Sequence, residues 1–148
     1  MSAEGRVFVD TNILVYAYDV DAAEKHTTAQ DLLTRLWKSR QGVLSTQVLQ
    51  EFYITVTRKL STPLDPATAR RVIAPYQAWP VQLIDVATVL EASEIAERHQ
   101  LSFWDGLIVA AARQAGAERV LSEDLQADRV MESVRIENPL VDWPTTRG

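Results

Sequence analysis

The sequence contains no cysteine among its 148 residues. This absence excludes a disulfide-stabilised fold, a thiolate nucleophile and a zinc site built on thiolates, and it is compatible with a reducing compartment. No apolar stretch is long enough to span a membrane, and the N-terminus MSAEGRVFVD lacks the basic and apolar regions of a secretory signal. We therefore expect a cytoplasmic protein.

Basic residues are outnumbered, with 15 Lys and Arg against 20 Asp and Glu, for a net charge of −5. This balance argues against loose electrostatic attachment to nucleic acid or to an anionic membrane. If four acids are neutralised together by a divalent metal, however, the remaining charge is only −1. The acidic total therefore does not exclude an RNA substrate.

Apolar residues make up 47% of the chain, and the length is that of one globular domain, residues 1–148. Short runs rich in Val, Leu and Ile alternate with longer stretches of helical periodicity. This alternation predicts an α/β fold with a mostly parallel central sheet. The strands are expected at residues 6–9, 43–45, 81–84, 119–121 and 134–136.

The helices follow from apolar spacing and from their start and stop signals. For example, Asp65 and Pro66 form an N-cap followed by proline at the first helical position, and Gly116 closes a helix at its C-terminus. The tail from about residue 138 is expected to be irregular. The helices are expected at residues 11–19, 24–40, 46–60, 65–79, 87–99 and 104–115.

Two aspartates follow predicted strands. Asp10 ends the run RVFVD, and Asp124 comes shortly after the strand ending RVL. In a parallel α/β sheet the carboxyl ends of the strands border the crevice where ligands bind. Each residue also has a simpler interpretation, because Asp10 can cap the following helix and Asp124 can belong to an ordinary turn.

Two further acids lie on predicted helices. Asp105, in SFWDGL, is near a helix start, where Ser102 and Asp105 also fit a capping box. Glu51 borders the apolar face of the helix at 46–60, and periodicity alone would leave it in solvent. Carboxylates brought together repel one another, and divalent cations offset that repulsion. With no cysteine and two histidines, all-oxygen ligation indicates Mg²⁺ or Mn²⁺.

Four blocks of the sequence together resemble the PIN domain, in particular the VapC-type toxins of toxin–antitoxin systems. The resemblance runs from about Val7 to Val134, and no block is specific alone. The blocks are VDTNILVYAYD at 9–19, the segment QVLQEFYITVTRKL that contains Glu51, SFWDGLIVAAARQAG at 102–116 and VLSEDLQ at 120–126.

The resemblance implies a compact α/β/α sandwich and a metal-dependent endoribonuclease. The acidic positions of the family fall on Asp10, Glu51, Asp105 and Asp124. Asn12 and Ser122 match supporting polar positions, and Asp128 is a possible additional acid.

In the expected chemistry these acids hold one or two Mg²⁺ or Mn²⁺ ions, and a metal-activated water attacks the scissile phosphorus. The products would carry 5′-phosphate and 3′-hydroxyl ends. Arg58, Lys59 and Arg113 are candidates for contacts with the RNA backbone. The resemblance also implies a homodimer and a cognate antitoxin protein as partner.

Two alternatives come from other functional classes. A phosphatase could use Asp10 as nucleophile, but related enzymes carry a second aspartate two residues later, where this chain has Asn12. A non-catalytic module that binds RNA or protein would use the acids only as caps and turns. It predicts no dependence on metal.

Overall fold

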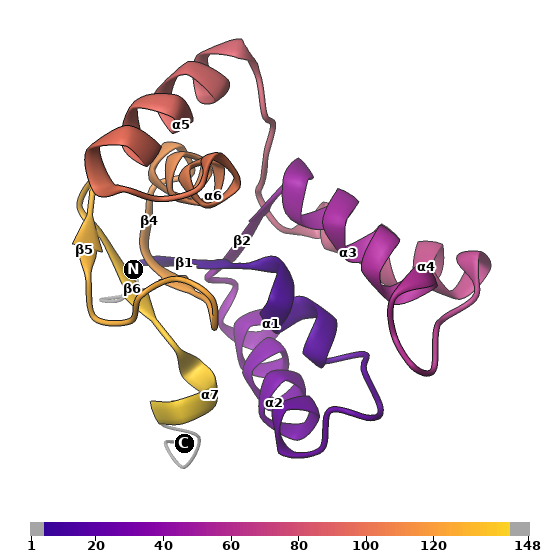
Figure 1. Ribbon diagram of the computed structural model, residues 1–148. Helices are drawn as coiled ribbons and strands as arrows, with labels where there is room; N and C mark the ends of the chain where they lie inside the picture. Colours follow the sequence, from indigo (N-terminus) through magenta and orange to yellow (C-terminus); the bar gives the residue numbers. More distant parts are fainter. Residues whose placement is uncertain (1–4, 143–148) are drawn as a thin grey trace.

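The computed structural model describes residues 5–142, and its centre is a six-stranded sheet with the order β3-β2-β1-β4-β6-β5. All neighbouring strands are parallel except β5 and β6, which are antiparallel. Figure 1 shows α5 and α6 together on one side of the strands and α1 and α2 on the other. The expected α/β/α sandwich with a mostly parallel sheet is confirmed. The strands are β1 (Arg6–Val9), β2 (Gly42–Ser45), β3 (Val81–Gln82), β4 (Ala117–Leu121), β5 (Val130–Met131) and β6 (Val134–Glu137).

Most helices lie where the sequence predicts them. Side-chain caps begin several of them, among them Ser45 for α3, Asp65 for α4 and Asp85 for α5. These caps satisfy backbone N–H groups that have no partner inside the helix. The helices are α1 (Thr11–Tyr16), α2 (Glu24–Ser39), α3 (Thr46–Arg58), α4 (Pro66–Ile73), the 3₁₀ helix η1 (Ala74–Ala78), α5 (Val86–His99), α6 (Phe103–Gln114) and α7 (Pro139–Asp142).

Two helix predictions were wrong in their bounds, and one strand was missed. The helix expected at 65–79 ends at Ile73 and continues as η1, because Pro75 has no N–H to donate within an α-helix. The helix expected at 11–19 ends at Tyr16. The strand β5 was not predicted. Its hairpin to β6 turns through Glu132 and Ser133, both at positive φ, without the Asn or Gly that usually marks such a turn.

The tail also differs from expectation. Residues 139–142 form the short helix α7 where an irregular segment was expected from about 138. The remaining residues of that tail, 143–148, lie outside the described part of the chain. The assignment of residues 1–148 to one domain stays a prediction.

The core is built around the central strand β1, where Val7, Phe8 and Val9 are completely buried. A strand covered by helices on both faces has no solvent side, so its apolar residues run continuously instead of alternating. After this strand, the Asp10 N–H donates to the Leu121 carbonyl at the end of β4, at 2.9 Å. The carboxyl ends of β1 and β4 thus lie side by side, which brings Asp10 close to the segment after β4. Within residues 5–142 no helix has the length and apolar character needed to cross a bilayer.

Candidate active site

Asp10 is buried at the carboxyl end of β1, with 6% of its surface exposed. Its Oδ1 accepts from the Thr11 N–H at 2.7 Å and caps α1, while its Oδ2 accepts from the Ser122 hydroxyl at 2.7 Å. Burial raises the pKa of the Asp10 carboxyl to about 6. The two hydrogen bonds oppose this shift, and the negative charges of Asp124 and Glu51 add to it. Asp10 is therefore both a helix cap and a carboxylate that a cation would stabilise.

Ser122 connects Asp10 to the segment after β4. This serine is completely buried, and its Oγ accepts from the Asp124 N–H at 3.1 Å and the Leu125 N–H at 3.2 Å. One hydroxyl group thus orients the carboxylate of Asp10 and holds the turn that carries Asp124.

Asn12 links the start of α1 to the same turn. Its Nδ2 donates to Asp124 Oδ2 at 2.9 Å, and its Oδ1 accepts from the Glu123 N–H at 3.2 Å. The side chain of Asp124 is thereby directed toward α1, although the residue itself is exposed. Asn12 and Ser122 both lie where they can support the neighbouring acids.

Glu51 reaches the site from α3 and is partly buried, so the solvated position that periodicity alone would give it is wrong. Its Oε1 accepts from the Thr11 hydroxyl at 2.7 Å, and its Oε2 accepts from Gln47 Nε2 at 3.2 Å. The same Gln47 nitrogen donates to the Trp104 carbonyl at the start of α6, at 3.3 Å. Gln47 is buried, and its Oε1 has no hydrogen-bond partner.

Sequence reasoning assigned no role to Thr11 or Gln47. Gln47 lies four residues before Glu51, a spacing that places both side chains on one helix face. That spacing was the available signal, but a glutamine beside a glutamate is more often a surface pair. The hydrogen bond to the Trp104 carbonyl, from a distant part of the chain, accounts for the buried position of Gln47.

Asp105 comes from the first turn of α6 and is half-buried. Its N–H donates to the Ser102 hydroxyl at 3.1 Å, so the serine of the predicted capping box does cap this helix. Burial raises the pKa of the Asp105 carboxyl, and the charges of Asp124 and Glu51 raise it further, against a lowering hydrogen bond with Ser102. The charges that act on Asp10 therefore also act on Asp105. We call Asp10, Glu51, Asp105 and Asp124 the acid cluster.

A surface hollow of about 400 Å³ adjoins the acid cluster between α1, α3 and the segment after β4. We call it the acidic pocket. Glu51 and Asp124 supply its charged wall beside the cluster, and Val15 and Leu60 supply an apolar wall. Its other lining residues are Thr11, Asn12, Tyr16, Asp19 and Thr55.

The acid cluster fits a divalent cation in its donor chemistry. All of its donors are carboxylate oxygens, the ligands that Mg²⁺ and Mn²⁺ prefer. The pKa of Asp10 is raised mainly by burial and to a smaller extent by the charges of Asp124 and Glu51, and a bound cation would favour its ionised form. Within residues 5–142, however, no three acidic or histidine side chains are gathered closely enough to form a ready-made metal group. Both oxygens of Asp10 and of Glu51 accept hydrogen bonds from the protein, and each carboxylate keeps further lone pairs for a cation. A single cation held by all four acids would require their side chains to come closer together.

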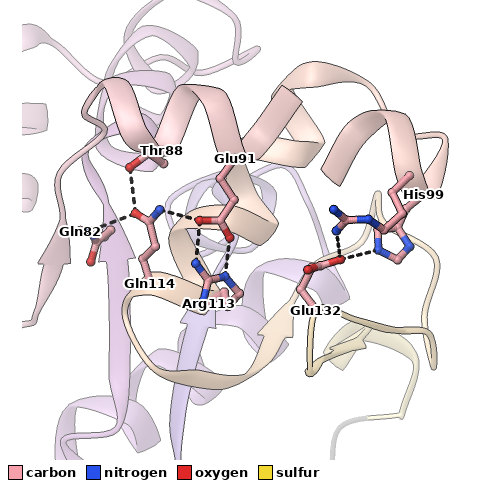
Figure 2. Close-up of polar contacts among 8 residues, drawn as sticks. Gln82, Thr88, Glu91, His99, Arg113, Gln114 and Glu132 are labelled. Carbon is pink, nitrogen blue, oxygen red and sulfur yellow. Dashed lines mark hydrogen bonds and ion pairs between the residues drawn. The ribbon is translucent and has the colours of Figure 1, made fainter. Parts of the chain in front are cut away.

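The basic candidates are distributed differently from the acids. Arg58 and Lys59 are exposed at the C-terminal end of α3. Arg113 forms a two-pronged ion pair with Glu91 of α5, which Figure 2 shows beside Gln114. Its guanidinium is thus engaged between α5 and α6.

Asp128 is exposed in a left-handed conformation with φ of 68°. Its N–H donates to the Ile136 carbonyl at 2.7 Å, a contact that belongs to the turn before β5. The described geometry thus gives this residue a role in the turn.

Comparisons with known proteins agree with the fold. The PIN-domain family matches residues 7–132. VapC20 of Mycobacterium tuberculosis, described as a toxin that cleaves the sarcin-ricin loop, is 25% identical with a TM-score of 0.63, over 80% of this chain and 89% of that chain. No curated protein gives a significant sequence match.

Two structures of complexes with DNA share the fold at lower identity. VapBC2 from Rickettsia felis, bound to a promoter fragment, is 18% identical with a TM-score of 0.60, over 89% of this chain and 97% of that chain. FitAB bound to a DNA fragment is 18% identical with a TM-score of 0.64, over 90% of this chain and 95% of that chain.

Proposed function

Because the chain belongs to the PIN-domain family, we propose that it is a metal-dependent endoribonuclease that hydrolyses phosphodiester bonds of RNA. The observation that carries the proposal is the acid cluster, whose members come from four separate segments of the chain. The charges of Asp124 and Glu51 act on both Asp10 and Asp105. Caps and turns do not require such convergence. The residues proposed to hold Mg²⁺ or Mn²⁺ are Asp10, Glu51, Asp105 and Asp124.

In this proposal some side chains bind the metal ion and others orient those metal-binding side chains. When bound, a divalent ion supplies an activated water and positive charge near the phosphoryl group. Asp10 presents a buried carboxyl group that is half-ionised at a pH of about 6 and becomes ionised as the pH rises further. Ser122 and Asn12 orient Asp10 and Asp124 through the hydrogen bonds described above, and Thr11 and Gln47 do the same for Glu51.

The biological role proposed is that of the toxin of a toxin–antitoxin pair, acting in the cytoplasm. The likeness to VapC20, a toxin that cleaves an RNA loop, supports it. The likeness to VapBC2 supports a cognate antitoxin as partner. A homodimer is part of the same proposal. Among the basic residues, Arg58 and Lys59 remain candidates for RNA contacts, whereas the pairing of Arg113 with Glu91 favours a structural role.

The test is cleavage of labelled RNA by the purified protein, with Mg²⁺ or Mn²⁺ and with EDTA. Asp10→Asn and Asp105→Asn, checked for folding by circular dichroism, should each reduce cleavage at least a hundredfold, in line with the loss of a ligand or its support. Lys38→Gln, a change of one exposed charge on α2, is the control and should cleave normally. The cut ends should carry 5′-phosphate and 3′-hydroxyl groups.

The alternatives predict other outcomes. A non-catalytic binding module gives no cleavage with wild type or variants, and no heat of metal binding in calorimetry. An aspartate-nucleophile phosphatase releases phosphate from a small phosphate ester and forms a covalent phosphate on Asp10. Either result would show that the proposed nuclease function is wrong.

A further inference from the structure

Lys25, the second residue of α2, lies beside the acidic pocket. Its Nζ is 2.5 Å from Glu123 Oε2, and Glu123 lies between Ser122 and Asp124 in the chain. Tyr16, which lines the pocket, donates its hydroxyl to Glu123 Oε1 at 2.5 Å. The ammonium also lies 5.1 Å from the centre of the Tyr16 ring. Lys25 is thus fixed next to the segment that carries a member of the acid cluster.

An acidic pocket needs positive charge nearby if it is to receive an RNA phosphate. Several arginines are engaged with acids elsewhere: Arg113 pairs with Glu91, Arg98 with Glu132 and Arg119 with Glu137. In the close-up of α5 and α6, Arg113 and Glu132 both lie in polar networks between elements (Figure 2). Lys25, by contrast, is tied directly to the neighbour of Asp124.

Lys25 can give up its ion pair with Glu123 and bind a phosphate group instead. The two side chains are 48% and 24% exposed, so water screens their attraction and the ion pair is weak. A phosphate offers the ammonium an equivalent anionic oxygen. RNA can therefore take the place of the Glu123 carboxylate without leaving a buried charge unpaired.

We propose that Lys25 contacts a backbone phosphate of the RNA substrate at the acidic pocket, and that Glu123 competes with RNA for this lysine. The proposal rests on the proposed ribonuclease function, since it names a contact for that substrate. Under this proposal Glu123 weakens RNA binding, although it lies beside Asp124 in the chain. Substituting Glu123 should therefore strengthen RNA binding, whereas substituting Lys25 should weaken it.

The experiment is equilibrium binding of a short fluorescent single-stranded RNA in Mg²⁺, measured in an Asp105→Asn background so that the RNA stays intact. Lys25→Gln should weaken binding roughly fivefold and reduce the slope of log affinity against log salt by about 0.7, as expected for one lost phosphate contact. Lys25→Arg should retain the affinity. Lys38→Gln, on the last turn of the same helix, should leave it unchanged.

Glu123→Gln should strengthen binding, and this gain should shrink when Lys25→Gln is also present, because the two residues are coupled. If both single variants weaken RNA binding to the same extent, the pair is only a strut between α2 and the segment after β4, and the proposal is wrong. Unchanged binding in Lys25→Gln, or no measurable RNA binding at all, also overturns it. Cleavage of RNA by the wild-type protein is measured separately. If the protein binds RNA but never cleaves it, the proposed ribonuclease function is wrong, and the comparison of RNA binding between the variants remains valid.

Discussion

The ionised form of Asp10, which metal binding would require, is the form that destabilises the folded protein. The folded-state pKa of Asp10, about 6, exceeds the ordinary value of 3.8. Between these pH values the folded protein binds more protons than the unfolded chain, so stability falls as pH rises through this window. The stabilisation from the protonated group is fully present below 3.8 and lost above about 6.

We predict that Asp10→Asn stabilises the metal-free protein at pH 8 by up to roughly 3 kcal/mol, because the amide removes the unfavourable buried charge. Near pH 4 the difference should vanish. Urea unfolding in EDTA at the two pH values measures it, with Asp128→Asn at an exposed turn as control. Equal destabilisation of Asp10→Asn at both pH values would show that its hydrogen bonds matter more than its charge.

Through the family resemblance, the sequence named the four candidate acids and two of their hydrogen-bond partners, Asn12 and Ser122. It did not name Thr11 or Gln47, the partners of Glu51. Asp10 and Asp124 follow strands, which is a local signal. Gln47, by contrast, is recognisable only from the long-range packing that joins it to the Trp104 carbonyl. Sequence position does not indicate this contact, since 57 residues separate the two.

At the scale of elements, the close contact between α5 and α6 sets the position of Asp105, which lies in the first turn of α6. Gly106, the next residue on α6, is buried, and a Cβ added to it would lie 2.5 Å from the Ala92 carbonyl oxygen on α5. Such a distance is well inside van der Waals contact, and the obstacle is backbone. The helices can approach this closely only because Gly106 has no side chain.

We predict that Gly106→Ala destabilises the protein by roughly 1–3 kcal/mol through overpacking, although alanine is the better helix former. It should also lower RNA cleavage, because α6 must move and carries Asp105 with it. Thermal unfolding and cleavage assays measure the two effects. Ser93→Ala, at an exposed position of α5, serves as control, and a Gly106→Ala variant as stable as wild type would refute the close contact.

The elements were predictable to the extent that their signals are local. Runs of Val, Leu and Ile located five strands, and caps such as Ser102 located the helix starts. The 3₁₀ helix η1 and the strand β5 were missed for different reasons. Pro75 interrupts a helical pattern that is otherwise continuous, and β5 is short and exists through its pairing with β6.

At the scale of the whole molecule, several large apolar side chains near the starts of α5 and α6 are exposed. Leu83, Val86 and Leu90 are 67%, 74% and 62% exposed, and Trp104 at the start of α6 is 62% exposed. Val86 and Leu90 are four residues apart and share one face of α5. An exposed apolar face of this kind is typical of a contact between proteins. In the proposed homodimer, a second copy of the chain would cover these apolar side chains.

If the proposed homodimer uses this face of α5, Leu90→Glu should convert it into a monomer, because two such charges would face apolar side chains across the contact. Light scattering at several protein concentrations measures the mass. Val20→Glu, a change at another exposed apolar residue between α1 and α2, should leave the dimer intact. A wild type that is monomeric at all concentrations would contradict the dimer itself.

The adjacency of β1 and β4 has a consequence for the order of events during synthesis. Asp10 and Ser122 are 112 residues apart in the chain, and the hydrogen bond between them requires β4 to pair with β1. A ribosome that has made only α1 to α5 has exposed Asp10 and Glu51 but cannot have completed the site. The nascent chain therefore passes most of its translation without the assembled acid cluster, and the cluster forms only after β4 and the segment that follows it have emerged.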